Sequence, residues 1–382
     1  MGVLVFMNGS LKIGEVSGIP IKLHFTLIVI IALITWSIGA NLEGFANWLG
    51  IEVVISPGLQ SYALGAIMAS GLFFSVFIHE MAHSIIAQRM GIKVEEISLW
   101  ILGGIANIGE IPKDPDSEIR MSVAGPLASL GIGVVSLGIG LISPPTPSLV
   151  LVYLGVLNFI LAGFNLIPAF PMDGGRILRA LFAKREDYVS ATQKAATIGK
   201  GFAILIAIVG FFYNFFLVII GIFIYLGTGQ EAFRTSQEAE GERIETLLKK
   251  VEAKKVMSKP VETVPPDLTV REFLENAMEI QHTGFPVVEN EEVIGIITLE
   301  DTKKIDEERI DQTQIKEVME KNVMYFGPED TLDKIWKKMG EEDVGRFPII
   351  SRDGELVGMI TRSDIMRAFK RLTELDSLRE KI

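Results

Sequence analysis

The sequence predicts a multi-domain chain, with a polytopic α-helical membrane domain of about six spans and short membrane-associated β-hairpins, followed by a soluble α/β domain. The chain has 382 residues, of which 49% are hydrophobic. Residues 1–230 contain only 12 Lys+Arg and 13 Asp+Glu, whereas residues 231–382 contain 24 and 34. An apolar half followed by a charged half is typical of a membrane domain joined to a soluble one. The charged half also contains an internal repeat, described below.

Six apolar stretches account for the predicted spans. A helix needs about 20 apolar residues to cross a bilayer. The stretches that approach or exceed this length are roughly 22–41, 62–90, 120–142, 149–170, 195–212 and 214–229. An Asn8-Gly9 pair within residues 3–18 predicts a β-hairpin before the first span. Residues 91–119 are β-prone and interrupted by glycine, which predicts a second membrane-associated sheet between the second and third spans.

The basic residues predict the orientation of the spans. The segments 42–61, 143–148 and 213–214, which we expect on the outer side, contain no Lys or Arg. All the Lys and Arg residues of the first 185 positions fall in segments on the opposite side. Because cytoplasmic loops are enriched in Lys and Arg, both termini are predicted to be cytoplasmic. The expected location is the cell membrane, with the lipid bilayer as the surrounding solvent.

Composition also limits the chemistry. The chain has no cysteine, so disulfides and thiolate ligands are excluded, and any zinc must be held by His or carboxylate. There are only four histidines, which makes a closely spaced pair informative. The net charge of −11 argues against nonspecific nucleic-acid binding, which requires a basic surface.

His79, Glu80 and His83 form an H-E-x-x-H motif in the apolar run GLFFSVFIHEMAHSIIAQRM. The run predicts a helix, on which residues i and i+4 share a face, so both imidazoles can bind one zinc at about 2.0–2.1 Å. Zinc lowers the pKa of a water that it binds, and Glu80 can accept the proton. A chance match is the alternative. Three ionisable residues within five positions of a membrane helix favour the metal site instead.

Asp173 is the predicted third ligand. A catalytic zinc has three protein ligands and one open position. Asp173 is the only Asp or Glu between Glu118 and Glu186, and it follows the fourth span on the side where His79 and His83 are expected. The alternative role for Asp173 is to cap the helix that begins at the glycine pair after it.

With these residues, the sequence closely resembles the site-2 protease family of intramembrane metalloproteases, in the prokaryotic form that carries a CBS-domain pair. HEMAH matches the family's zinc motif and FPMDGGR matches its Asp-Gly motif. The resemblance implies that His79, His83 and Asp173 ligate one zinc per chain and that Glu80 is the catalytic acid/base. It also implies cleavage of a peptide bond in, or next to, a transmembrane segment of another protein.

The internal repeat occupies the charged half. Phe285-Pro286 matches Phe347-Pro348 at an offset of 62, and the match extends over most of each copy. Each copy is predicted to contain a strand, an amphipathic helix, two strands and a helix. The segments GIITLED (295–301) and GMITRSD (358–364) resemble the terminal motif of CBS domains, two of which pair into one module.

The CBS resemblance implies a ligand. In nucleotide-binding members, the threonine of this motif contacts phosphate and the aspartate bonds a ribose, which agrees with phosphate binding at a helix N-terminus. The implied nucleotide-binding residues are Thr298, Asp301, Thr361 and Asp364, and the implied ligands are AMP, ADP or ATP. Such pairs also form homodimers. A pair with a purely structural role is the alternative.

Three further residues are weaker candidates. Asn165 resembles a family asparagine near the active centre that could orient substrate or stabilise an oxyanion; an interhelical hydrogen bond is the alternative. A strand around Gly103 and Gly104 could pair with an unwound substrate by β-addition, or be a plain hairpin. The small residues of VAGPLASLG, including Gly125 and Ser129, predict close helix packing.

The predicted domains are a transmembrane metalloprotease (1–230), a charged helical linker (231–250) and two CBS domains (251–310 and 311–382). The predicted function is regulated intramembrane proteolysis. A CBS-gated transporter or channel would instead use the histidine motif as an ion path. The separate Asp-Gly motif and the lack of evident inverted repeats favour the protease. A catalytically inactive relative is a third alternative, although all the expected catalytic groups are present.

Overall fold

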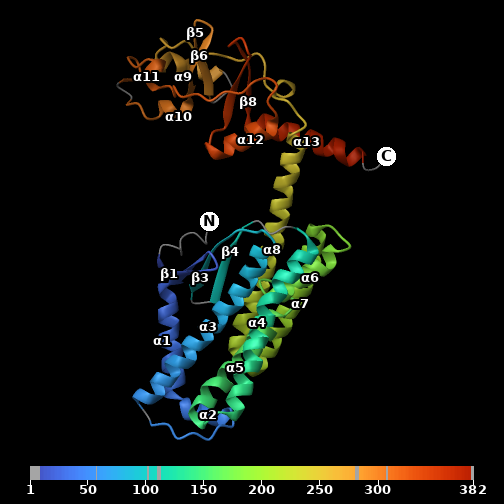
Figure 1. Cartoon of the computed structure of the whole chain (residues 1–382). Helices are drawn as coiled ribbons and strands as arrows, with labels where there is room; N and C mark the ends of the chain where they lie inside the picture. The colour runs from blue at the N-terminus through green and yellow to red at the C-terminus, as the bar shows by residue number, and fades with distance from the viewer. Residues whose placement is uncertain are drawn as a thin grey trace. The chain divides into compact units, whose positions relative to one another are not determined.

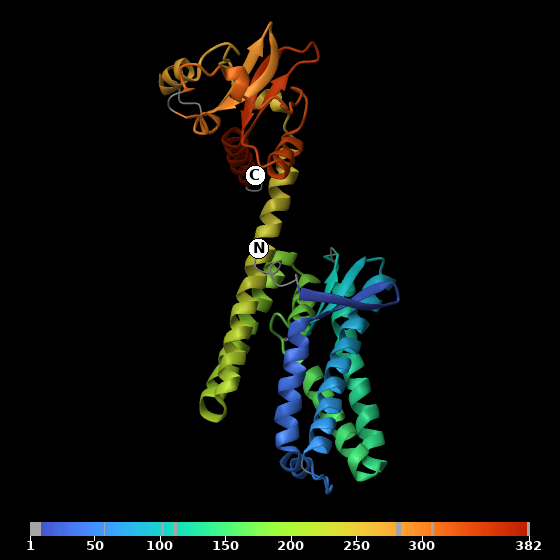
Figure 2. The same cartoon turned by 90° about the vertical axis from the view of Figure 1, so that its left-hand side faces the viewer.

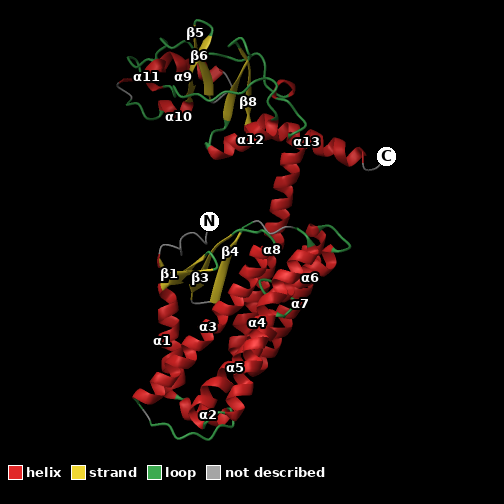
Figure 3. Ribbon diagram, viewed as in Figure 1, coloured by secondary structure: helices red, strands yellow, loops and turns green. Residues whose placement is uncertain are grey.

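The computed structural model describes residues 9–56, 58–100, 103–109, 113–279, 284–306 and 309–379. The chain divides into two compact units, Met1–Ser236 and Gln237–Ile382. The first is a helical bundle with a small sheet, and the second is an α/β unit (Figures 1 and 3). The division falls within helix α8 (Phe215–Leu248), so the predicted linker at 231–250 is largely a continuation of the last span. The exact boundaries of the four predicted segments stay predictions.

The membrane unit contains about six spans, as predicted. Five described helices are long and apolar enough to cross a membrane: α3 (Leu59–Arg89), α4 (Pro115–Ile142), α5 (Pro145–Asn165), α7 (Tyr188–Tyr213) and α8. A sixth span results if α1 (Phe25–Ala40) and α2 (Leu42–Trp48), which meet at a bend of 75°, are counted together. Between α5 and α7 lies the short amphipathic helix α6 (Asp173–Ala183).

The predicted spans differ from the helices at their ends. The first span starts at Phe25 rather than residue 22, because residues 19–24 form a strand and the His24 ring accepts a hydrogen bond from the Thr26 N–H at the helix N-terminus. Helix α4 begins earlier than predicted, since Asp114 Oδ2 accepts the Ser117 N–H at 2.9 Å. The residues that cap α1 and α4 are polar. A search for apolar runs therefore places the starts of these helices wrongly.

One four-stranded sheet joins the N-terminal hairpin to the segment between the second and third spans. Its order is β1 (Ser10–Val16), β2 (Ile19–His24), β3 (Val94–Trp100) and β4 (Gly103–Ile108). Strands β2 and β3 are parallel, whereas β1 and β4 pair antiparallel with their neighbours and form the two edges. The sheet lies at the end of the bundle where α3 ends (Figure 2).

The described N-terminal hairpin is formed by β1 and β2. The chain reverses at Ser17-Gly18, whose φ angles are +53° and +78°. A two-residue hairpin turn of this kind needs positive φ at both positions, which Gly provides most readily. The turn predicted at Asn8-Gly9 is a different one and stays a prediction. Asn8 lies outside the described residues.

Small residues allow α4 and α5 to pack closely. A Cβ atom at Gly155 would lie 3.0 Å from the Leu137 nitrogen, and one at Gly133 would lie 3.3 Å from the Gly155 carbonyl oxygen. Such close backbone approach is typical of helix packing in membranes, where small residues replace a hydrophobic driving force.

The second unit has two similar halves. The first half contains α9 (Val270–Glu279), β5 (Gly284–Glu289), β6 (Glu292–Thr298) and α10 (Leu299–Thr302). The second contains α12 (Leu332–Glu341), β7 (Arg346–Ile350), β8 (Leu356–Thr361) and α13 (Arg362–Arg379). Short helices η2 (Ala253–Lys255) and α11 (Ile315–Val318) precede the two halves. The predicted first strand of each copy is only a single bridge, Val264 with Val287 and Phe326 with Ile349.

The two halves exchange their leading segments. Ser258, which precedes the first half, pairs with Met359 of β8, and Glu320, which precedes the second half, pairs with Ile296 of β6. Next to these bridges, a methionine packs on the backbone of a glycine, Met257 on Gly358 and Met319 on Gly295. This reciprocal pairing makes the two repeats one module, and it explains why both Gly and Met recur in the repeat.

Candidate metal centre

Three buried side chains from two helices converge in the membrane unit. His79 and His83 lie one turn apart on α3, and Asp173 is the first residue of α6. The Asp173 Oδ2 atom lies 3.3 Å from His79 Nε2 and 3.2 Å from His83 Nε2. Two ligands at about 2.0–2.1 Å from a tetrahedral zinc are separated by about 3.3–3.4 Å. The separations of the Asp173 oxygen from the two imidazole nitrogens therefore fit a zinc ion.

Helix α4 contacts the Nδ1 atom of both imidazole rings. His83 Nδ1 donates to the Met121 carbonyl at 2.7 Å, and His79 Nδ1 lies 2.9 Å from Ser129 Oγ. Met121 and Ser129 are fully or almost fully buried. Metal-binding histidines commonly use their second nitrogen in this way, which fixes the ring orientation. The two contacts turn the Nε2 atoms toward Asp173.

The polar atoms at this site are arranged to suit a bound cation. A carbonyl only accepts hydrogen bonds, so the His83 proton is on Nδ1, and in the neutral ring Nε2 carries a lone pair. That lone pair faces Asp173 Oδ2, which is buried and has no hydrogen-bond partner among the described residues. Buried acceptors that face each other without a proton are unfavourable. A bound zinc ion satisfies all of them, so the residues fit the metal.

Gly125 leaves the space between the two rings open. It lies on α4 between Met121 and Ser129, at a spacing of four residues from each. A Cβ atom at this position would lie 2.2 Å from His83 Nε2 and 2.6 Å from His79 Nε2. Any side chain at Gly125 would therefore occupy the place where a metal must sit. We refer to Met121, Gly125 and Ser129 as the α4 stripe.

The loop 166–172, between α5 and α6, brings Asp173 into the bundle. The two glycines after Asp173 permit this, because a Cβ at Gly174 would lie 2.4 Å from the Ile167 carbonyl oxygen. A Cβ at Gly175 would lie 2.6 Å from the Ala169 carbonyl carbon. The loop thus folds directly over the start of α6. The Asp-Gly-Gly sequence is needed for this close approach, as well as for the carboxylate.

Glu80 lies beside the edge strand of the sheet. Its side chain packs on the backbone of Gly104 in β4, where a Cβ atom would lie 2.4 Å from Glu80 Cγ. Gly103, the first residue of β4, has a φ of +128°, a conformation that favours glycine. The two predicted glycines therefore place an edge strand in contact with the predicted catalytic carboxylate.

Asn165 bonds to its own helix and not to the described residues of the metal site. Its Nδ2 donates to the Leu161 carbonyl of its own helix at 3.0 Å, so its role at the site stays a prediction. The interhelical bond considered for it is made instead by Asn158, about two turns earlier on α5. Asn158 is fully buried, and its Nδ2 donates to Ser75 Oγ on α3 at 3.0 Å.

The four predicted nucleotide-binding residues form two equivalent caps. Asp301 Oδ2 accepts the Thr298 N–H and Oγ1–H at 3.0 and 2.6 Å. Asp364 Oδ2 accepts the corresponding groups of Thr361 at 2.9 and 2.6 Å. Each pair caps the helix after it, a structural role that the sequence motif also explains. The second carboxylate oxygen of each aspartate, Oδ1, takes no part in this cap.

Sequence reasoning missed the metal-facing role of the α4 stripe. Gly125 and Ser129 were predicted to serve helix packing, whereas they face the imidazoles. One signal could have found them. Positions 121, 125 and 129 repeat every four residues, as do His79 and His83, so two helix faces of matching period can meet. Nothing in the sequence alone pairs those two faces.

Two family models match most of the chain. The Peptidase family M50 model matches residues 67–146 and 145–208, and the CBS domain model matches residues 253–306 and 315–371. A zinc metalloprotease of Methanocaldococcus jannaschii is 34% identical over 98% of this chain and 100% of its own length.

Solved structures are similar to each part. A site-2 protease from Methanocaldococcus jannaschii is 37% identical and covers 58% of this chain and 95% of its own, with a TM-score of 0.42. The CBS-domain pair of protein MJ0100, solved with 5′-methylthioadenosine and S-adenosyl-L-methionine, is 25% identical over 31% of this chain and 96% of its own, with a TM-score of 0.29. By its sequence relatives, the chain is a multi-pass membrane zinc metalloprotease of peptidase family M50, in the site-2 protease form that carries a CBS-domain pair.

Proposed function

We propose that this protease hydrolyses a peptide bond in, or next to, a transmembrane segment of another protein, using zinc held by His79, His83 and Asp173. The observation that carries the proposal is the convergence of three buried ligand atoms, all within 4.8 Å of one another, on helices of the membrane unit. Buried ionisable groups at this depth are retained for function. The Lys and Arg bias supports an orientation with the site toward the cytoplasm and both termini there.

The residues of the site have separate roles in the proposed hydrolysis. When bound, zinc supplies a Lewis acid that polarises the scissile carbonyl and lowers the pKa of the attacking water. Glu80 accepts the proton from that water and returns it to the leaving amide nitrogen. Ser129 and the Met121 carbonyl hold the imidazoles in place during this exchange. The burial of the site excludes bulk water from competing for these groups.

Strand β4 is the proposed substrate-binding edge. A helical peptide bond is already hydrogen-bonded, so the substrate must unwind before it is cut. An edge strand can bind an extended segment through its free N–H and C=O groups. Strand β4 is the last strand of the sheet, and Gly104 touches Glu80, so a strand added there would lie beside the catalytic carboxylate.

Cleavage of a purified transmembrane substrate by the full chain tests the proposed function. Zinc-loaded protein in detergent should cut the substrate within or beside its apolar segment, with the site mapped by mass spectrometry. Removal of zinc by a chelator should stop cleavage, and one equivalent of zinc should restore it. Cleavage that continues after the metal has been removed would exclude a zinc mechanism.

A proline scan of the same substrate tests the binding edge. Proline lacks the N–H that a strand donates to its neighbour. Because alternate residues of an added strand donate to the edge, prolines near the cut should inhibit at every second position. Inhibition with no such alternation would contradict binding as a strand, and would leave the zinc site itself unaffected.

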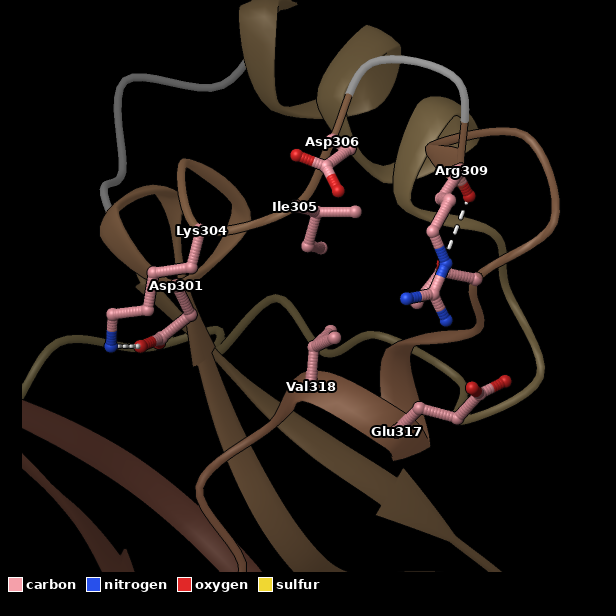
Figure 4. A pocket seen from close by; sticks show the side chains of 8 residues that line it. Asp301, Lys304, Ile305, Asp306, Arg309, Glu317 and Val318 are labelled. Atoms are coloured by element: carbon pink, nitrogen blue, oxygen red, sulfur yellow. Dashed lines mark hydrogen bonds and ion pairs between the residues drawn. The ribbon is translucent and has the colours of Figure 1, made fainter.

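We further propose that the CBS pair binds an adenine nucleotide at its first half. Asp301 lines a pocket of about 360 Å³, a suitable size for a small ligand (Figure 4). Lys304 lies on the same wall, and Arg309 lies on the opposite wall. Asp301 Oδ1 pairs only loosely with Lys304, at 3.5 Å, and its side chain is 24% exposed. A carboxylate oxygen held only by this long ion pair, together with two cations, suits a ribose and a phosphate.

The corresponding aspartate of the second half, Asp364, is closed off by neighbouring side chains. Asp364 is 5% exposed in its side chain, and Oδ1 is paired with Arg367. Ser258 Oγ lies 3.5 Å from the same oxygen. The two Thr-Asp motifs are therefore alike in their caps but different in access. This supports one nucleotide per chain rather than two. The homodimer implied by the CBS resemblance stays a prediction.

Calorimetric titration with AMP, ADP and ATP tests this proposal. One of the nucleotides should bind wild-type protein at one site per chain, and Asp301→Ala should abolish the binding. Asp364→Ala is the matched control. It removes the same cap, at an expected loss of about 1 kcal/mol of stability, yet should leave binding in place. No heat from any nucleotide would leave the pair with a structural role.

A further inference from the structure

Helix α8 contacts the loop that leads into Asp173. Thr228 is fully buried, and its Oγ1 donates to the Phe170 carbonyl at 2.7 Å. One residue earlier, a Cβ atom at Gly227 would lie 3.0 Å from Pro171 Cδ. The helix therefore approaches the loop 166–172 as closely as a glycine permits. Phe170 is three residues before the predicted metal ligand.

A second contact from the same face of α8 reaches α6. Glu231 Oε1 accepts Arg179 Nη1 at 2.8 Å, and Arg179 Nε also donates to Glu118 of α4 at 2.9 Å. Arg179 and Glu118 are almost completely buried. The guanidinium lies 5.0 Å from the centre of the Phe170 ring. Arg179, which belongs to α6, thus contacts α4, α8 and the loop 166–172.

We propose that Thr228 and Glu231 are positioning residues for Asp173, an inference that rests on the proposed metal site. Thr228 fixes the loop before Asp173, and Glu231 fixes the helix after it through Arg179. Because zinc requires its ligands to be placed within a few tenths of an ångström, groups that orient a ligand influence metal affinity without touching the metal.

Thr228 and Glu231 lie on the helix that continues from the membrane unit into the second unit. Helix α8 continues from Thr228 and Glu231 to Leu248, whose side chain is fully buried in a core of the second unit. No other described helix belongs to both units. The helix that positions Asp173 is therefore the one that leads into the CBS pair.

Thr228→Val is the test, because it keeps the shape of the side chain and removes the hydroxyl. The variant should bind metal about tenfold or more weakly in a chelator competition, the range expected for loss of a ligand-orienting group. With cobalt in place of zinc, its visible absorption spectrum should also differ from that of wild type. Thr228→Ser, which retains the hydroxyl, should restore both properties.

Thr192→Val is the matched control. Thr192 is also fully buried in the membrane unit, and its Oγ1 also donates at 2.7 Å, but to the Tyr188 carbonyl of its own helix. This variant should retain wild-type metal affinity and an unchanged cobalt spectrum. Glu231→Gln provides a second variant should Thr228→Val fail to fold. It should weaken metal binding less, since Arg179 keeps its bond to Glu118.

The outcomes separate this inference from the proposed function. Wild-type protein that binds no stoichiometric metal would contradict the metal site itself. Wild-type protein that binds one metal, with Thr228→Val and Glu231→Gln matching it in affinity and spectrum, would overturn only the positioning role of α8. Equal losses in Thr228→Val and Thr192→Val would also overturn it, because the effect would then belong to any buried threonine.

Discussion

Gly125→Ala is expected to remove the metal from the protein while leaving the membrane unit folded. The added Cβ would lie 2.2 Å from His83 Nε2 and 2.6 Å from His79 Nε2, where the zinc must sit. Alanine is favoured over glycine within a helix by roughly 0.5–1 kcal/mol, so the helix itself should tolerate the change. Zinc content should fall from one per chain to near zero, and cleavage should become undetectable. Both are measured on purified protein, by elemental analysis and by the substrate assay.

Gly131→Ala in the same helix is the control. A Cβ at Gly131 would meet no atom within 4 Å, so this variant should keep its zinc and its activity. Circular dichroism should show equal helix content in both variants. If Gly125→Ala retained one zinc per chain and wild-type activity, the ions would have to be bound away from the two Nε2 atoms.

Glu80→Gln should retain the zinc and lose catalysis. The amide has nearly the shape of the carboxylate, but it cannot accept the proton of the attacking water. Loss of a general acid/base typically lowers the rate by about 10²–10⁴-fold. Initial rates on the transmembrane substrate, normalised to zinc content, measure the effect.

His79→Ala provides the comparison for Glu80→Gln, since it should lose metal and activity together. Separation of the two properties in Glu80→Gln is what assigns Glu80 to proton transfer rather than to metal binding. Wild-type rates in zinc-loaded Glu80→Gln protein would show that another group carries the proton.

Local rules account for the parts of the site that the sequence predicted. His79 and His83 share a face because a helix repeats every 3.6 residues, and lipid makes three ionisable residues in one span costly without a cation. Asp173 was predicted because the whole region between Glu118 and Glu186 contains no other acid. The spans followed from apolar length, and the CBS pair followed from its repeat.

Contacts between distant segments account for the rest. Met121 acts through its backbone carbonyl, which no residue type reveals. Gly125 and Gly133 lie on one helix in similar sequence, yet one faces the imidazoles and the other packs on α5. The difference depends on the rotation of α4 in the bundle. Thr228 likewise contacts Phe170 across 58 residues of sequence, a separation that local patterns do not connect.

Zinc K-edge X-ray absorption on the purified full chain is the most direct test of the metal centre. The account predicts one zinc per chain, with two imidazoles and a carboxylate oxygen among its ligands at about 2.0–2.1 Å. In Asp173→Ala protein, the carboxylate contribution should disappear and the affinity should fall. A zinc environment that is the same in wild type and Asp173→Ala would contradict the proposed site.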